Sequence, residues 1–296
     1  MAIQAFSDYL LLEKKYSKHT VTAYIRDLEA FQSFLDTEHE GQSIPEATYV
    51  FIRHWIVSLV DQGLTNRSVN RKVSSLNSYY KFLQKTDSIA VNPLKGHKAL
   101  KVAKKVQVPF SELEMKDVIE RLSEDKSFNT LRDRLIVELF YATGVRRIEL
   151  IELKLSDIDL EGKTLKVLGK RNKERYIPLI DSVIETIRAY LDYRYQLQEI
   201  VDKDHLFLTK KGHKIYEMLV YRIINKYFSK ASSKLKCSPH VLRHSFATHL
   251  LNEGADINAV KELLGHTSLA ATQVYTHSSI AELKKVYSKS HPRNLK

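Results

Sequence analysis

The chain has 296 residues, a length that suits two domains of ordinary size. Of these residues, 43% are hydrophobic and 28% are charged, which is typical of a globular protein. No apolar run reaches the ~18 residues that a membrane-spanning helix needs, and the N-terminus lacks the pattern of a signal peptide. A single cysteine, Cys237, excludes an internal disulfide and fits a reducing compartment, so we expect a cytoplasmic protein without a membrane partner.

The charge is strongly basic, because 47 Lys and Arg residues outnumber 35 Asp and Glu and leave a net charge of +12. The excess is +5 in residues 1–105 and +7 in the remainder. Because both parts are basic, both are expected to face the same polyanion. A basic surface that only favours solubility would give the same totals, so charge alone does not decide for nucleic acid.

Residues 1–88 are predicted to form a compact four-helix domain, because their apolar side chains recur at spacings of three and four. Ser17 is expected to cap the second helix, Gly63 to end the third and Thr65 to cap the fourth. Residues 89–108 break this pattern, with five lysines between Lys95 and Lys105. This segment is interpreted as a solvated linker or as a basic strap along phosphates, and the two are compatible.

Residues 109–296 are predicted to form a second, mixed domain. Helices are expected at about 111–123, 127–142 and 146–154, and again from 215 onward. Between them, "KTLKVLG" and "ERYIPL" alternate with period two around "KRNK", which is typical of a β-hairpin. The segment "LFLT" (206–209) is a candidate third strand. The predicted fold class is therefore mostly α with a small β-sheet.

The stretch "SPHVLRHSFATHLL" carries the first candidate site. His240 and Arg243 are spaced i,i+3, so they share one face near a helix N-terminus, where an anion such as phosphate binds well. His240 and His244 would suit a metal, but the arginine between them repels Zn²⁺, and Val241 stands where a zinc protease has glutamate. A structural pair of histidines explains the spacing equally well.

Two further stretches carry arginine and lysine at defined turns. In "YATGVRRIELIEL", Gly144 ends one helix and Arg146 begins the next, with Glu149 as its expected local ion-pair partner. In "VLGKRNKERYIPL", the hairpin tip is expected to carry four cations suited to a DNA groove. These are Lys170, Arg171, Lys173 and Arg175. A surface salt bridge and a solvated turn remain the simpler alternatives for the two stretches.

Taken together and in order, these stretches resemble the tyrosine recombinases of the Xer type. The resemblance extends from "SKHTVTAYIRDLEAFQSFL" through the three stretches above to "LGHTSLAATQVYTH" and the closing "HPRN". It implies a SAM-like four-helix core-binding domain and a mixed α/β catalytic domain that form a C-shaped clamp on DNA. Two departures are Ile148, where the family usually has serine, and a linker without the usual Leu-Pro-Lys run.

The resemblance implies a reaction at a phosphodiester. It assigns six catalytic positions: Arg146, Lys170, His240, Arg243, His266 and Tyr275. Tyr275 would attack phosphorus to give a 3′-phosphotyrosyl bond, with His240 as base and Lys170 as the acid for the 5′-oxygen. The arginines and His266 would bind the non-bridging oxygens. Neither a metal, another cofactor nor ATP is expected.

The resemblance also implies partners. Double-stranded DNA would contact the N-terminal helices and the hairpin, with these candidates: Arg26, Arg67, Asn70, Arg71, Lys72, Arg171 and Lys173. Exposed helix faces without DNA contact would show the same residues. The tail after Tyr275, with Ile280, Leu283 and Val286 in helical register, is expected to dock on a neighbouring subunit in a homo- or hetero-tetramer. A DNA translocase is a further candidate partner.

The predicted function is site-specific recombination through a Holliday junction, with resolution of chromosome or plasmid dimers as the expected role. An integrase or transposase of a mobile element would use the same chemistry and remains an alternative. No separate arm-type DNA-binding domain precedes the predicted four-helix unit, which disfavours a lambda-like phage integrase. A non-catalytic DNA-binding protein with the same fold is disfavoured because all six positions are occupied.

Overall fold

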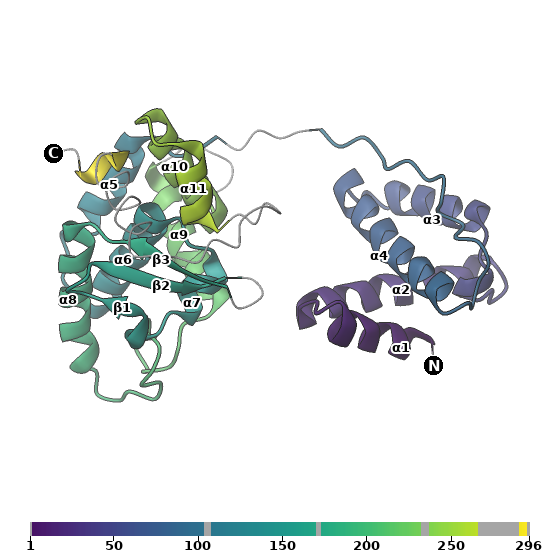
Figure 1. The fold of residues 1–296 in the computed structure, drawn as a ribbon, viewed down its shortest axis with the longest axis horizontal. Coiled ribbons are helices and arrows are strands. Elements are labelled where there is room, and N and C mark those ends of the chain that lie inside the picture. The colour runs from purple at the N-terminus through teal and green to yellow at the C-terminus, as the bar shows by residue number, and fades with distance from the viewer. Residues whose placement is uncertain (1, 104–107, 170–172, 232–236, 266–289, 295–296) are drawn as a thin grey trace. The chain divides into compact units, whose positions relative to one another are not determined.

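The computed structural model describes residues 2–103, 108–169, 173–231, 237–265 and 290–294. The chain divides into two compact units, Met1–Lys105 and Val106–Lys296 (Figure 1). Each unit has its own hydrophobic core. Within the described residues, no helix is both long and apolar enough to cross a membrane.

Residues 2–85 of the first unit are mostly helical, as their apolar spacing predicted, and its described residues 86–103 contain no helix. Its elements are α1 (Ala2–Asp8), a π-helical turn (Tyr9–Glu13), α2 (Lys18–Glu38), a 3₁₀ turn (Ile44–Glu46), α3 (Tyr49–Asp61) and α4 (Asn66–Lys85). The two predicted caps are confirmed, since Ser17 Oγ accepts from Thr20 N at 3.2 Å and Thr65 Oγ1 from Ser68 N at 3.3 Å. Several aromatic side chains pack within the core, where the ring centroids of Phe31 and Trp55 lie 4.8 Å apart.

The second unit packs helices around a short antiparallel sheet (Figure 1). Its helices are α5 (Glu112–Arg121), α6 (Phe128–Thr143), α7 (Arg147–Glu152), α8 (Asp181–Tyr195), α9 (Glu217–Ala231), α10 (Pro239–Asn252) and α11 (Ile257–Leu264). Its strands are β1 (Ile158–Asp159), β2 (Thr164–Leu168) and β3 (Glu174–Pro178), in the order β1-β2-β3. Short 3₁₀ turns lie at Leu155–Asp157 and Pro292–Asn294. Helix α6 is the buried centre and packs against both α8 and α10.

The predicted third strand at residues 206–209 is wrong, because β1 occupies that place in the sheet. Leu206, Phe207 and Leu208 are fully buried. A short run of buried apolar residues is also typical of a strand, which explains the wrong prediction. Their backbone groups are satisfied elsewhere: Leu206 N donates to the Leu153 carbonyl at 2.8 Å and Leu208 N to the Tyr190 hydroxyl at 3.1 Å. Helix α8 was not predicted, although its buried Val183, Ile187 and Tyr190 follow helical spacing.

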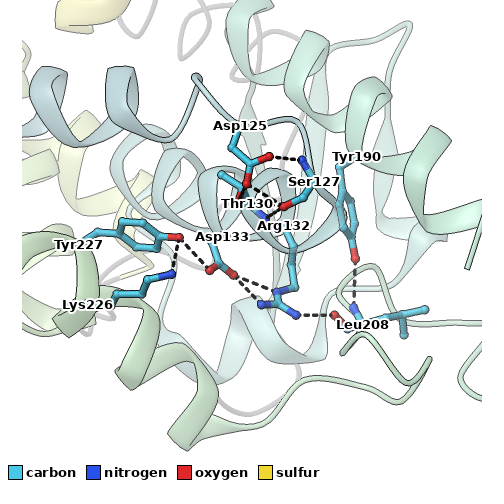
Figure 2. A network of polar contacts seen from close by, with 9 residues as sticks. All are labelled: Asp125, Ser127, Thr130, Arg132, Asp133, Tyr190, Leu208, Lys226 and Tyr227. Atoms are coloured by element: carbon cyan, nitrogen blue, oxygen red, sulfur yellow. Dashed lines mark hydrogen bonds and ion pairs between the residues drawn. The ribbon is translucent and has the colours of Figure 1, made fainter.

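A buried polar network joins α6, α9 and the segment around Leu208 (Figure 2). Arg132 donates to Asp133 at 2.7 Å and to the Leu208 carbonyl at 3.4 Å, and the Tyr227 hydroxyl donates to Asp133 at 3.3 Å. Burial raises the pKa of Asp133, and the Arg132 guanidinium opposes that shift. Because Leu208 and Tyr227 belong to different segments, their bonds to Arg132 and Asp133 fix the N-terminal end of α6 within the unit.

The last described residues pack against their own unit. His291 is fully buried beside α6, with Nε2 3.4 Å from the Tyr141 carbonyl, and burial lowers its pKa to about 4. Arg293 donates to the Glu138 carboxylate at 3.1 Å. The segment predicted to dock on a neighbour, around Ile280 to Val286, lies outside the described residues.

Gly144, at the end of α6, provides a sharp test of this packing. Its φ is +58°, and a Cβ there would meet the Phe246 ring at 2.4 Å and Leu264 at 2.8 Å. Gly144→Ala is expected to lower the free energy of unfolding by roughly 2–4 kcal/mol, from left-handed strain and overpacking. Chemical denaturation of the full chain measures this.

Gly254 provides the matched control. Its φ is +82°, but a Cβ there would meet nothing within 4 Å. Gly254→Ala should therefore cost only the backbone strain, about 1 kcal/mol. Equal losses for the two variants would contradict the close approach of α6, α10 and α11 at Gly144.

Candidate active site and DNA-facing residues

Arg146 and Glu149 form the start of α7. Arg146 is the N-cap residue, and its backbone N–H donates to Glu149 Oε2 at 2.7 Å while its Nη1 donates to Oε1 at 2.6 Å. The predicted local ion pair is therefore confirmed. The Glu149 carboxylate is 3% exposed, against 24% for the Arg146 side chain, so the arginine extends from a buried anchor toward solvent.

Arg175 is the second partner of Glu149, and its predicted place on the hairpin tip is wrong. The residue lies within β3 and is 4% exposed, because strand alternation turns it inward with Ile177. Its Nη1 and Nη2 donate to the two oxygens of Glu149 at 3.0 and 2.7 Å, and its Nε donates to the Leu263 carbonyl at 2.9 Å. Arg175 thus links β3, α7 and the end of α11.

Arg243 approaches the same place from α10. It is 9% exposed, and its two terminal nitrogens donate to the carbonyls of Gly144 and Leu264. Arg146 Nη2 donates to the Gly265 carbonyl at 3.2 Å. The last turn of α11 therefore offers three successive carbonyls, each to a different arginine. These are the carbonyls that a helix end leaves unpaired, and they carry the negative end of its dipole.

The electrostatics of this cluster favour an anion. Burial raises the pKa of Glu149, but Arg175 and Arg146 outweigh burial and hold it at about 2. Burial and the neighbouring Arg146 lower the pKa of Arg243 to about 10, so it still carries its proton at neutral pH. Three guanidinium groups against one carboxylate leave an excess positive charge. The partly exposed edge of Arg146 makes this excess accessible to a phosphate.

The other predicted site residues are placed as follows. His240 is exposed on the first turn of α10, one turn before Arg243, and His244 is exposed as well. Lys173 is exposed directly before β3, and its carbonyl accepts a hydrogen bond from Gly169 N at 2.7 Å. Lys170, Arg171, His266 and Tyr275 lie outside the described residues. Among those described, no group of three or more His, Cys, Asp or Glu side chains could hold a metal ion.

In the first unit, Arg26 on α2 and Arg67 on α4 are exposed, as a DNA-contacting side chain must be. Asn70 already has partners: its Nδ2 donates to the Leu100 carbonyl at 2.8 Å, and its Oδ1 accepts from Leu100 N at 2.9 Å. Asn66 Nδ2 donates to the Lys101 carbonyl at 2.8 Å. These bonds hold residues 98–103, which we call the strap, against the N-terminal half of α4.

The remaining two candidates, Arg71 and Lys72, both contact one buried carboxylate. Asp27 on α2 is 3% exposed and accepts from Arg71 Nη2 at 2.9 Å and from Lys72 Nζ at 3.1 Å. The Arg71 side chain remains 50% exposed. Sequence reasoning missed Asp27, whose partners are more than 40 residues away in the chain.

Comparison with known proteins identifies the family. Residues 109–282 match the Phage integrase family, and residues 3–86 match the phage integrase N-terminal SAM-like domain. The chain belongs to the Xer-type tyrosine recombinases. Among its relatives, the tyrosine recombinase XerC of Staphylococcus carnosus is 40% identical over 290 residues, covering 98% of this chain and 97% of that protein. XerC of Bacillus subtilis is 36% identical over 297 residues, covering 99% and 97%.

Solved recombinase structures share the fold. The XerH site-specific recombinase bound to palindromic difH substrate gives a TM-score of 0.71 at 24% identity, covering 90% of this chain and 79% of that one. The Tn1549 transposon integrase in complex with circular intermediate DNA gives 0.70 at 19%, covering 95% and 98%. These likenesses show that the chain has the recombinase fold, while the family models and the XerC relatives make it a tyrosine recombinase.

Glu149 should impose a pH dependence on the stability of this recombinase. Its folded pKa of about 2 lies below its ordinary 4.5, so its contribution is complete above about pH 4.5 and is lost as pH falls toward 2. The contribution is worth roughly 3 kcal/mol. Denaturant unfolding between pH 7 and pH 2 should show this loss in the wild type and not in Glu149→Gln.

Glu152 on the same helix is the control for that measurement. It is 55% exposed and pairs with Lys214 at the surface, so Glu152→Gln should keep the wild-type pH slope. At pH 7, Glu149→Gln should itself lose roughly 3–5 kcal/mol, because the cations lose their buried counter-charge. Identical slopes for wild type and Glu149→Gln would refute the central role of this carboxylate.

The strap should open when Asn70 is truncated. Asn70→Ala removes two hydrogen bonds to Leu100, each worth about 1 kcal/mol, so trypsin cleavage after Lys98 and Lys101 should accelerate roughly tenfold or more. Asn66→Ala removes one bond and should accelerate cleavage less. Mass spectrometry of the early fragments gives both rates, and wild-type rates for both variants would contradict the anchoring.

Proposed function

We propose that the chain cuts and rejoins DNA at paired sites through a 3′-phosphotyrosyl intermediate and a Holliday junction, and that it resolves chromosome or plasmid dimers in the cytoplasm. Support comes from one observation above all: Arg146 and Arg243, from different helices, converge on the carbonyls that end α11. Relatives named XerC, 36–40% identical over nearly the whole chain, favour this role over that of a mobile-element integrase.

The two arginines would bind the non-bridging oxygens of the phosphate under attack. In the pentavalent transition state these oxygens gather charge, so donors that are already fixed stabilise it more than the ground state. Their fixed carbonyl and carboxylate partners keep the guanidinium groups from reorganising. His266 would add a third donor. Loss of one such donor typically raises the barrier by about 3–4 kcal/mol.

The phenol of Tyr275 would form the bond to phosphorus while the bond to the 5′-oxygen breaks. The phenol, with an ordinary pKa of ~10, would transfer its proton to His240, and the departing 5′-oxygen would take a proton from Lys170. The exposed position of His240 on the first turn of α10, one turn from Arg243, suits this role. Attack by the 5′-hydroxyl of a partner strand would then reverse these steps and exchange strands.

This chemistry would need neither metal nor ATP, because the phosphotyrosyl bond retains the energy of the phosphodiester and the arginines supply the charge. The active assembly would be a homo- or hetero-tetramer on two DNA sites, with the tail after Tyr275 docked on a neighbouring subunit. A DNA translocase would be a further partner that controls activity.

A covalent trap tests this proposal. The target duplex is first selected from random DNA with the full chain, and a substrate nicked beside the cleavage point is then made from it. The wild type should become covalently attached to this DNA, because the excised fragment diffuses away. Tyr275→Phe should bind with unchanged affinity and form no adduct, as read on a denaturing gel.

Tyr221→Phe is the matched control, since Tyr221 is 45% exposed on α9, and this variant should trap like the wild type. An adduct with Tyr275→Phe would show that another residue is the nucleophile. An intact phosphodiester after prolonged incubation of the wild type would refute the recombinase mechanism for this chain.

A further inference from the structure

Asp27 is a buried acid within a surface predicted to bind a polyanion. It lies midway along α2, is 3% exposed, and accepts hydrogen bonds from Arg71, from Lys72 at 3.1 Å and from the Ser75 hydroxyl at 2.8 Å. All three donors come from neighbouring turns of α4. A neutral residue would pack there without the desolvation cost of a carboxylate, and it would leave the surface more basic.

The geometry around Asp27 fixes one guanidinium in a defined orientation. Arg71 uses both terminal nitrogens, Nη1 toward Oδ2 and Nη2 toward Oδ1, to form a two-pronged ion pair. The planar group then keeps a second edge, formed by Nε–H and one outer Nη–H, which no described residue occupies. Because the side chain is 50% exposed, this edge is accessible from solvent.

An arginine fixed in this way suits base reading better than phosphate binding. A mobile arginine can follow any phosphate, whereas a fixed edge fits only a pair of acceptors at one place, such as O6 and N7 of guanine. Ordering a long side chain on binding costs conformational entropy, and the ion pair with Asp27 removes most of that cost in advance. The negative charge simultaneously weakens binding to phosphates in general.

We propose that Arg71 is a specificity-determining residue that reads a base edge in the major groove, and that Asp27 is its positioning residue, which lowers non-specific DNA affinity and raises sequence specificity. This inference rests on the proposed DNA recognition by the first unit. It assigns Lys72, 18% exposed and bound to the same carboxylate, to the support of Asp27 and not to DNA.

The test compares two affinities for each variant at fixed salt: for the selected target duplex and for a random duplex of equal length. Asp27→Asn keeps the size of the side chain and removes the charge. It should bind random DNA several-fold more tightly, while the ratio of target to random affinity falls about tenfold, the loss of one base contact. If the ion pair had only a structural role, Asp27→Asn would lower the melting temperature and leave this ratio unchanged.

Glu13→Gln is the charge-matched control. Glu13 is 60% exposed and pairs with Lys85 at the surface of the same unit, so its removal should tighten random binding slightly and keep the ratio. Arg71→Lys keeps the charge and the exposed position but has no planar edge, so it should lower the ratio while the salt dependence stays the same. This variant tests the proposal even where Asp27→Asn does not fold.

The double variant Asp27→Asn/Arg71→Lys completes the cycle. If Asp27 acts through Arg71, the ratio of target to random affinity of the double variant should equal that of Arg71→Lys alone. Additive losses, or a wild-type ratio in Arg71→Lys, would overturn the inference. A wild-type chain that binds target and random DNA equally would instead refute the proposed site-specific function, so the two failures are distinguishable.

Discussion

The second unit depends on one interaction, the pairing of the buried Glu149 carboxylate with Arg146 and Arg175. Arg146 and Arg175 can remain at the junction of α7, β3 and α11 only because this anion compensates their charge. The carbonyls at the end of α11 then complete the arrangement and receive Arg243 as well. The proposed phosphate site would therefore lie at a helix C-terminus, which ordinarily attracts cations, because the arginines held there exceed the single carboxylate in number.

Much of this arrangement follows from local rules. The caps at Ser17 and Thr65 and the left-handed glycines that end α6 and α11 are set by residues within one turn, so the sequence predicts them. The Arg146–Glu149 pair has the same origin. Arg175 was misplaced because its charge was assigned to the hairpin tip, although the alternation of β3 turns it inward with Ile177.

The partners of the candidate DNA-contacting residues could not be predicted in the same way. Asn70 bonds to Leu100, 30 residues away, and Arg71 bonds to Asp27, 44 residues away. Such pairs are decided by how helices and strap pack, and no local spacing reveals them. The strand predicted at 206–209 was wrong for a related reason. Its apolar composition suits a buried strand, but its backbone N–H groups donate to Leu153 and Tyr190, which lie elsewhere in the chain.

The anchoring of the strap also limits the length of free chain between the two units. Lys101 is held by α4, and Phe110 N donates to Ser245 Oγ at 2.8 Å in the second unit. Only residues 102–109 connect these fixed points, at most about 30 Å of extended chain. Under the proposed recombination, both units would contact the same DNA, and so short a tether would keep the second at an effective concentration on the order of millimolar once the first had bound. Two individually modest contacts would then combine into one of high avidity.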